Sequence, residues 1–557
     1  MAKVKNKALF FTTSPRSPSK MIPEIKLLNE KFSGRKWDKK SQIEFMELLA
    51  QSDFFEGGGS KKDKAFSARD RITRAPKSLG FINLKPYIEL TDAGREFIFG
   101  KRPQEIFLRQ LLKFQIPSPY HVPTMAVKFF VKPYLEIMRL IRDLQGISFD
   151  ELKIFGMTLT DYRNYDSVLE KIRSFRATSG RYEGKSYNAL NNILEEIYSE
   201  DIAAGRTKTR ETADASLKKF LRTKRHNVRD YADACFRYLR YTEFFAISQR
   251  NRSIAVYPDK VKDLDFILET VNRNPVFISE TDSYKKYLFD SATPRLYSDD
   301  RANAIDSLMR ISDYTKNQLA AMSVVELKDL RDNIVSSHRD AKIKAEVEEI
   351  KSYALYSEIV DTYNEIISDG YYDTPLMLEY NTWRAMTMLD GGEIKGNFKF
   401  DDAGQPLSTA AGNMADIECD YGDFVLAVEV TMQKGSRQYE SEGEPVSRHF
   451  GQLKKKTGKE TYCLFIAPTI NSASLAHFYA LNKMEISYYG GKTKIIPLEL
   501  EQFMRLIDNS YNYEKRPTPQ ELKLFLEEVI RQEECSANEI EWADRIQDCV
   551  TNWLNYE

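Results

Sequence analysis

Two carboxylates stand in the apolar stretch "ADIECDYGDFVLAVEV". Residues 415–421 alternate between apolar and polar side chains, which places Asp416 on the polar face of a predicted strand. Residues 424–430 are apolar except for Glu429. A two-residue turn at Gly422-Asp423 makes a hairpin in which Asp416 faces Glu429, with Cβ atoms roughly 4.5–5.5 Å apart.

Two buried like charges at this distance repel each other, and burial by itself disfavours each ionised form. A hard divalent cation relieves both costs, because Mg²⁺ takes one or two carboxylates together with substrate phosphate oxygens. Such an ion stabilises charge and activates the attacking water in phosphodiester hydrolysis. We therefore predict that Asp416 and Glu429 bind Mg²⁺. The alternative is a proton shared by the pair, or a salt bridge to Lys434 or Arg437.

Further candidate groups flank the hairpin. Glu442 and Glu444 precede "PVSRHF", whose Arg448 and His449 open a predicted helix over 446–456 and can face the metal. Glu379, in "LEYNTW", faces the sheet if its helix packs through its apolar residues. The candidate catalytic residues are therefore Asp416, Glu429, Glu442, His449 and Glu379.

A mixed sheet must position these groups. The order of predicted elements over residues 370–500 is αβββαβαβ, which indicates a small sheet with helices on its faces. Its segments are the helix "PLMLEYNTWRAMTML", the strand "GNFKF", the two hairpin strands, the helix over 446–456, the strand "TYCLFIAP", the helix "SASLAHFYALNK" and the strand "TKIIPLEL".

A basic helix followed by a hairpin occurs near the N-terminus. Residues 61–77 hold seven Lys or Arg against two Asp. Two short apolar runs and a helix start at Thr91-Asp92 follow, which is the order of a winged helix. The basic residues of this helix are Arg69, Arg71, Arg74 and Lys77, of which Arg71, Arg74 and either Lys77 or Ser78 share one helical face. The alternative is a solvated basic face.

The same pattern returns in residues 227–258, where a helix is followed by a strand, the polar turn "QRNRS" and another strand. Two winged-helix-like units with basic helices indicate recognition of duplex DNA, where Arg reads guanine edges and other cations hold phosphates. The DNA-binding candidates of this second unit are Lys224, Arg229, Arg237, Arg240, Arg250 and Arg252.

Composition limits the remaining options. The chain is too long for one core, so we expect about three domains. Basic and acidic residues balance at 82 each, which argues against a protein that coats nucleic acid indiscriminately. No two cysteines have C-x-x-C spacing, and "GRYEGKS" lacks one residue of a P-loop, so neither a zinc knuckle nor a nucleotide-driven motor is expected. No segment reads as a signal peptide or membrane span, so we expect a cytoplasmic protein without membrane contact.

Seven segments in chain order resemble one known family. They are "SPRS", "ARDRITRAPKSLGFI", "AAGNMADIE", "VEVTMQKG", "EPVSRHF", "YCLFIAP" and "KIIPL". The chain resembles the AlwI/MlyI/PleI family of Type IIS restriction endonucleases and their nicking relatives, within the PD-(D/E)XK superfamily. The resemblance implies a multidomain α+β fold, with winged-helix-like recognition units in residues 1–260 (about 1–120 and 121–260), a helical linker in 261–368 and a catalytic α/β nuclease core in 369–557.

The resemblance also implies the activity: recognition of a short asymmetric DNA sequence and Mg²⁺-dependent cleavage a few base pairs to one side. Thr431 stands where the superfamily usually has lysine, which leaves His449, Glu442 or Lys434 to position the water. The expected partners are double-stranded DNA, a transient homodimer through the catalytic domains or a small partner subunit, and a cognate DNA methyltransferase that acts on the same site. The alternatives are a strand-specific nicking endonuclease and a DNA-binding regulator with an inert nuclease-like domain.

Overall fold

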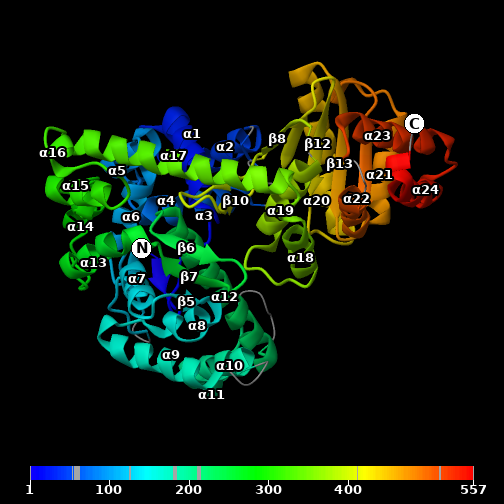
Figure 1. Ribbon diagram of the computed structural model, residues 1–557. Coiled ribbons are helices and arrows are strands. Elements are labelled where there is room, and N and C mark those ends of the chain that lie inside the picture. The colour runs from blue at the N-terminus through cyan, green and yellow to red at the C-terminus, as the bar shows by residue number, and fades with distance from the viewer. Residues whose placement is uncertain are drawn as a thin grey trace. The chain divides into compact units, whose positions relative to one another are not determined.

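The computed structural model describes residues 2–555 except for 53, 56–62, 125–126, 180–184, 210–214, 390, 411 and 513–515. Most of the loop expected at 55–62 and of the P-loop-like segment at 180–186 lies outside these residues. The chain divides into two compact units, unit 1 with residues 1–332 and unit 2 with residues 333–557 (Figure 1). No helix among the described residues is both long and apolar enough to cross a membrane.

Unit 1 begins with the expected helix, hairpin and helix order. Strands β2 and β3 pair antiparallel, with Ile82 opposite Leu90, and Thr91 caps the following helix. Helix α3 ends at Thr73, because Arg74 leaves helical geometry before Pro76 opens a separate turn of helix. Lys77 therefore lies outside the helix on which the sequence placed it. The elements are α1 (Met21–Phe32), α2 (Lys39–Ala50), α3 (Lys64–Thr73), α4 (Ala75–Ser78), β2 (Ile82–Asn83), β3 (Glu89–Leu90) and α5 (Asp92–Phe99).

The second pattern is also present in unit 1, with a longer helix than expected. Helix α12 (Leu217–Tyr241) leads into β6 (Phe245–Ser248) and β7 (Ser253–Val256), and β5 (Ile147–Ser148) pairs with the other edge of β7. The other elements up to α12 are β1 (Ala2–Val4), β4 (His121–Pro123), α6 (Pro103–Lys113), α7 (Pro133–Asp143), α8 (Phe149–Ile154), α9 (Tyr165–Ser179), α10 (Lys185–Ile197) and α11 (Ser199–Ala203).

Residues 261–368 are helical, as the sequence predicted, but they do not form a separate body. Leu264, Ile267 and Leu308 are fully buried, and residues 261–332 belong to unit 1. The remaining residues of this stretch belong to unit 2, where Ile359 and Tyr363 join the core. The elements are α13 (Val261–Thr270), α14 (Thr281–Phe289), α15 (Arg301–Met309), α16 (Lys316–Leu319), α17 (Val324–Lys351) and α18 (Tyr356–Ile367).

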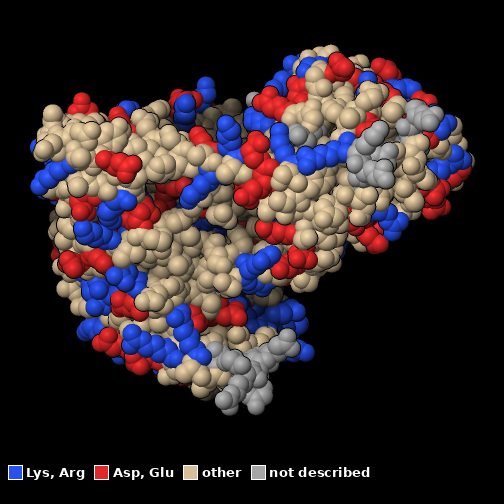
Figure 2. All heavy atoms as spheres, in the orientation of Figure 1, with Lys and Arg blue, Asp and Glu red and all other residues tan. Residues whose placement is uncertain are grey.

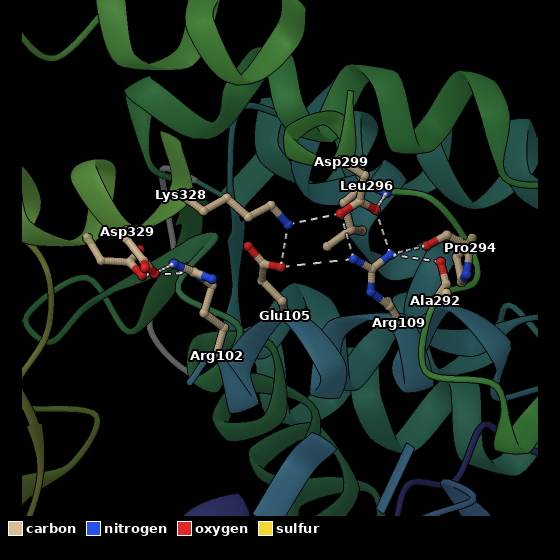
Figure 3. A network of polar contacts seen from close by, with 10 residues as sticks. Arg102, Glu105, Arg109, Ala292, Pro294, Leu296, Asp299, Lys328 and Asp329 are labelled. Atoms are coloured by element: carbon tan, nitrogen blue, oxygen red, sulfur yellow. Dashed lines mark hydrogen bonds and ion pairs between the residues drawn. The ribbon is translucent and has the colours of Figure 1, made fainter. Parts of the chain in front are cut away.

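A polar network inside unit 1 ties α6 to residues 292–299 and to the first turns of α17 (Figure 3). Arg109, which is only 5% exposed, makes two hydrogen bonds to the carboxylate of Asp299, at 2.8 and 2.9 Å. Lys328 bridges Glu105 and Asp299 at 2.7 and 2.9 Å. Each charge in this network therefore has a partner of opposite sign.

Unit 2 is a five-stranded mixed sheet with helices on both faces. The strand order is β14-β13-β12-β11-β8, where β12, β13 and β14 are parallel and β11 is antiparallel to both neighbours. The bounds are α19 (Thr374–Leu389), β8 (Glu393–Gly396), β9 (Lys399–Phe400), β10 (Pro406–Ser408), β11 (Ile417–Asp420), β12 (Phe424–Val430), α20 (Ser436–Thr457), β13 (Glu460–Ala467), α21 (Ser472–Lys483), β14 (Ile495–Glu499), α22 (Leu500–Asn512), α23 (Pro519–Cys535) and α24 (Glu539–Asn552).

Alternation along β12 divides the core of unit 2 into two clusters. Leu426 and Val428 join the cluster formed with α18, α19 and α22–α24. Val425 and Ala427 join the other cluster, formed with α20 and α21. Because side chains on a strand point alternately to opposite faces, Glu429 lies on the same face as Val425 and Ala427. The sheet thus directs Glu429 towards α20.

Candidate functional site

The hairpin has the register that the sequence predicted. Ile417 pairs with Val428 and Asp420 with Val425, and the backbone of Tyr421 bonds to that of Phe424. Asp416 precedes β11 by one residue, and its Oδ2 accepts a hydrogen bond of 2.8 Å from the backbone N–H of Val430. This contact fixes the Asp416 carboxylate beside the end of β12, where Glu429 lies.

His449 reaches the same place from α20. Its Nδ1 lies 2.8 Å from Oε1 of Glu429, and both side chains are nearly buried, at 10% and 8% exposed. Burial and the neighbouring Arg448 charge lower the pKa of His449 to about 4, so the ring is neutral at neutral pH. Its other nitrogen, Nε2, is buried and has no hydrogen-bond partner among the described residues. A neutral imidazole with one nitrogen held and the other unpaired is able to accept a proton.

Glu442 also comes from α20, which starts ten residues before the helix start predicted at 446. Proline favours the first turn of a helix. Here Pro445 lies inside the helix, and Glu442 is on its preceding turns. Oε1 of Glu442 accepts a hydrogen bond of 2.9 Å from Oγ1 of Thr431. Thr431 therefore holds a carboxylate of the site, a role that its position in the sequence did not reveal.

Glu379 completes the group from the opposite layer, on α19. It is 7% exposed, and its Oε2 accepts a hydrogen bond of 2.9 Å from the backbone N–H of Ala410. The structure thus brings together the five predicted residues Asp416, Glu429, Glu442, His449 and Glu379. Glu444, the alternative to Glu442, is exposed and pairs with Arg448 at 3.1 Å.

Burial and mutual repulsion dominate the electrostatics of these acids. Burial, followed by the charges of Glu429 and Glu442, raises the pKa of Asp416 well above its ordinary value. Burial and Glu442 likewise raise the pKa of Glu429, and burial and Asp416 raise that of Glu379. Each acid therefore carries an unfavourable charge unless a cation or a proton is added.

The two cations that sequence reasoning offered as salt-bridge partners do not supply this compensation. Lys434 and Arg437 are exposed, and neither makes an ion pair within the described part of the chain. Arg448 is the nearby cation that does act on the site, since its charge lowers the pKa of Glu429. Its guanidinium is already held by Glu444 and by Asn413, on the loop that leads to Asp416.

The donor set suits a magnesium ion that is shared with substrate. In the described ranges, no three His, Cys, Asp or Glu side chains form a ready-made cage for a metal ion. Mg²⁺ does not need one, because it is usually bound by one or two carboxylates and completes its shell with water and phosphate oxygens. Asp416 and Glu429 are two such carboxylates, and no lysine or arginine of the described residues is bonded to Glu429.

The residues of unit 1 that were predicted to contact DNA differ in their exposure and in their partners within the protein. Arg71 is bound to Glu24, which is buried, and Arg240 is itself buried at 6% exposed, so packing rather than base reading accounts for both. The guanidinium of Arg237 lies 3.1 Å from the carboxylate of Asp233. Lys77 is half-buried, and burial followed by Lys85 and Lys285 lowers its pKa. The predicted residues that are exposed are Arg69, Arg74, Arg229 and Arg250.

The remaining predicted contacts are partly buried. The Lys224 ammonium lies 4.5 Å from the ring centroid of Tyr198. Arg252 lies in the turn between β6 and β7 with a positive φ of 46°, and its carbonyl accepts a hydrogen bond from Phe149. Two of the exposed residues also have partners: Arg69 donates to Gln42 at 2.8 Å, and Arg74 pairs with Asp70 at 2.6 Å.

The chain matches the model of a known protein family. The match extends over most of the chain and places it among the restriction endonucleases, which bind DNA. Within that class the chain belongs to the AlwI restriction endonuclease family, whose model matches residues 77–506. This confirms the family that the sequence motifs indicated.

Two solved structures are similar to this chain. The small subunit of the heterodimeric restriction endonuclease R.BspD6I shares 27% identity over 36% of this chain and 100% of its own, with a TM-score of 0.31. Restriction endonuclease FokI shares 12% identity over 93% of this chain and 98% of its own, with a TM-score of 0.24. No curated protein matches the chain.

Proposed function

We propose that this restriction endonuclease is of Type IIS: it binds a short asymmetric DNA sequence and, with Mg²⁺, hydrolyses phosphodiester bonds a few base pairs outside it. The observation that carries the proposal is the convergence of four carboxylates, two buried and two partly buried, at one end of the unit 2 sheet without a lysine or arginine bound to Asp416 or Glu429 in the described residues. Such an arrangement costs stability unless a cation joins it, so it argues for a working site rather than an inert one.

Asp416 and Glu429 would hold the metal ion. When bound, Mg²⁺ supplies positive charge to the scissile phosphate and lowers the pKa of the attacking water. The backbone N–H of Val430 orients Asp416, and His449 orients Glu429. These two contacts keep both carboxylates in place before substrate arrives.

The residues around this pair would handle the water and its proton. His449 is neutral and presents a buried, unpaired Nε2, which is suited to accept a proton. Glu442, held by Thr431, and Glu379, held by the Ala410 N–H, offer carboxylate oxygens that orient a water molecule. We place His449 and Glu442 ahead of Lys434 in this role, because Lys434 is exposed.

Unit 1 would recognise the DNA sequence through winged-helix-like units. The exposed Arg69 and Arg74 flank the first hairpin, and Arg250 lies in the turn between β6 and β7. Replacing an arginine that reads a base should relax one position of the site, whereas replacing a phosphate contact should weaken all sequences alike.

The described residues of the chain hold one such acid cluster, so cutting both strands needs a second active site turned to face the antiparallel strand. A transient dimer of catalytic domains on DNA provides it most simply. A small partner subunit is the alternative, and a chain that has neither would nick one strand.

The test is digestion of a supercoiled plasmid of known sequence with purified protein, with Mg²⁺ and with EDTA, followed by run-off sequencing of both strands. We expect Mg²⁺-dependent cuts at a fixed distance from one asymmetric sequence. Linear product that rises more steeply with protein concentration than nicked circles supports the dimer, and nicked circles alone make the chain a nickase. Specific binding without any cut in Mg²⁺ would instead support the alternative of a DNA-binding regulator with an inert nuclease-like domain.

A further inference from the structure

The first half of α12 carries a straight row of cations. Lys218, Arg222, Arg225 and Arg229 follow one another at spacings of four, three and four residues, which places them on one line along the helix. At about 1.5 Å per residue the row is about 16 Å long. The helix begins at Leu217 with Ser216 as its cap, so the positive end of its dipole adds to the same end of the row.

The cations of the row are available to a ligand. Lys218, Arg222 and Arg229 are exposed and make no hydrogen bond or ion pair with any residue that the structure describes. Arg225 is half-buried, but its partners are neutral: Nη1 donates to Asn191 at 2.6 Å, and the guanidinium lies 5.0 Å from the ring centroid of Tyr187. These contacts orient Arg225 without neutralising it.

Buried residues on the other sides of the helix fix the row in position. Phe220, Leu221 and Val228 are buried, and α12 packs against α8, α10 and β6 within unit 1. In the space-filling view, Lys and Arg side chains gather at the outer edge of unit 1, in the region that Figure 1 labels α10 and α12 (Figure 2). The row is thus a preformed surface on a packed helix.

The second half of the same helix is different. Arg237 is paired with Asp233, and Arg240 is buried. A protein with equal numbers of acidic and basic residues has enough carboxylates to neutralise its cations, and it does so in this half. Four cations on one line, none with a carboxylate partner among the described residues, create a local positive field that favours an anion from outside the chain, which scattered single cations do not.

We propose that the row from Lys218 to Arg229 binds the phosphate backbone of duplex DNA without reading its sequence. Duplex DNA carries one phosphate per about 1.7 Å of its axis, both strands counted, so a row of about 16 Å meets several phosphates of one strand. Phosphate contacts position a protein on DNA but carry no sequence information. The inference rests on the proposed function only for the identity of the ligand as duplex DNA. It assigns the first half of α12 to binding the DNA backbone instead of reading bases.

The test compares two triple variants of the full-length chain. The row variant combines Lys218→Gln, Arg222→Gln and Arg229→Gln, and the control combines Lys171→Gln, Lys286→Gln and Lys316→Gln, three exposed lysines on α9, α14 and α16. Both lose three charges, and circular dichroism checks that both fold. Binding to a duplex that contains the recognition sequence and to a scrambled duplex of equal length is titrated in EDTA over a range of salt concentrations.

We expect the row variant to lose at least about tenfold in affinity for both duplexes by the same factor, with the slope of log K against log salt reduced by about 1 to 3. The control should keep the wild-type slope. An unchanged slope in the row variant overturns the proposal, as does loss confined to the recognition sequence, which indicates base reading. Binding of wild type to vesicles of anionic phospholipid that is lost in the row variant, with DNA binding intact, would make the row a membrane surface.

Failure of this inference is distinguishable from failure of the proposed function. The titrations are scored by binding without Mg²⁺, so they do not depend on cleavage. A wild-type chain that cuts as proposed while the row variant binds normally refutes the row alone. A reduced slope in a chain that never cuts supports the row and refutes the nuclease.

Discussion

Two regions of this molecule bury charged groups in opposite ways. In the network of unit 1, Asp299 lies between Arg109 and Lys328, and hydrogen bonds join it to both (Figure 3). In the acidic site of unit 2, Asp416 faces Glu429 and is bonded to a backbone N–H rather than to a cation. In the first region the carboxylate is balanced by cations of the protein, whereas in the second no lysine or arginine of the described residues is bonded to Asp416.

The pKa values express this difference. Burial by itself would raise the pKa of Asp299, but its hydrogen bonds to Arg109 and the charge of that guanidinium lower it to about 2. Burial raises the pKa of Asp416, and the Glu429 charge raises it further. The comparison teaches that burial of a carboxylate by itself does not indicate a ligand site, and that a carboxylate without a bonded cation is the better candidate for one.

The largest expected effect separates activity from stability at the acidic site. Asp416→Asn should reduce plasmid cleavage in Mg²⁺ by roughly a thousandfold or more, equivalent to about 4 kcal/mol, because the metal loses a ligand. The same change should not lower the thermal stability measured in EDTA, since it removes a buried charge and the amide oxygen still accepts from Val430.

Asp420→Asn is the matched control, on the same hairpin. Asp420 is more exposed and already pairs with Lys459 at 2.7 Å, so cleavage should stay near the wild-type rate. Wild-type cleavage by Asp416→Asn would show that the acidic site is not the catalytic one.

The second expected effect is a loss of stability when the charged network of unit 1 is disrupted. Arg109→Met should lower the free energy of unfolding of unit 1 by about 3 kcal/mol, because it leaves Asp299 buried with one cation in place of two. Urea denaturation followed by circular dichroism measures the loss. Cleavage per folded molecule should be unchanged.

Arg163→Met provides the comparison for that variant. Arg163 is 67% exposed and pairs with Asp161 at the surface, so its loss should cost much less stability than the loss of Arg109. Equal costs for the two arginines would mean that the buried network adds nothing beyond an ordinary surface pair.

The smallest expected effect is a dependence of stability on pH. Asp299 has a folded pKa of about 2 against an ordinary 3.8, so its ionised form stabilises the fold fully above about pH 4. This stabilisation, about 2 kcal/mol, is lost as the pH falls from about 4 towards 2. Urea unfolding of wild type and Asp299→Asn at several pH values should show a difference that shrinks on acidification. A difference that grows instead would reverse the assigned direction of the shift.

Much of the acidic site was predictable because its central pair is local. Turn chemistry at Gly422, the alternation along "ADIECDY" and the apolar run "FVLAVEV" fix the hairpin register, and a register fixes which residues face each other. The observed pairing of Ile417 with Val428 follows that register. Glu379 was predicted to face the sheet from the apolar residues of its helix, and His449 was a candidate because it follows the acidic residues in the sequence.

Contacts between distant segments were not predictable in the same way. Thr431 meets Glu442 only because α20 continues through Pro445, and a proline in sequence favours a start rather than a continuation. Arg71 had the right spacing for a DNA-reading face, yet Glu24, far away in the chain, holds it.

The sequence by itself determined the family, the order of elements and the facing acids, since these depend on motifs and on the fixed periods of helices and strands. Only the tertiary structure decided which cations are neutralised within the protein and which are left for a ligand. Arg240 and Arg229 lie on one helix, but one is buried and the other is exposed. The physical reason is that periodicity fixes the side of an element on which a residue lies, whereas its charge partner comes from whichever segment the fold packs against that side.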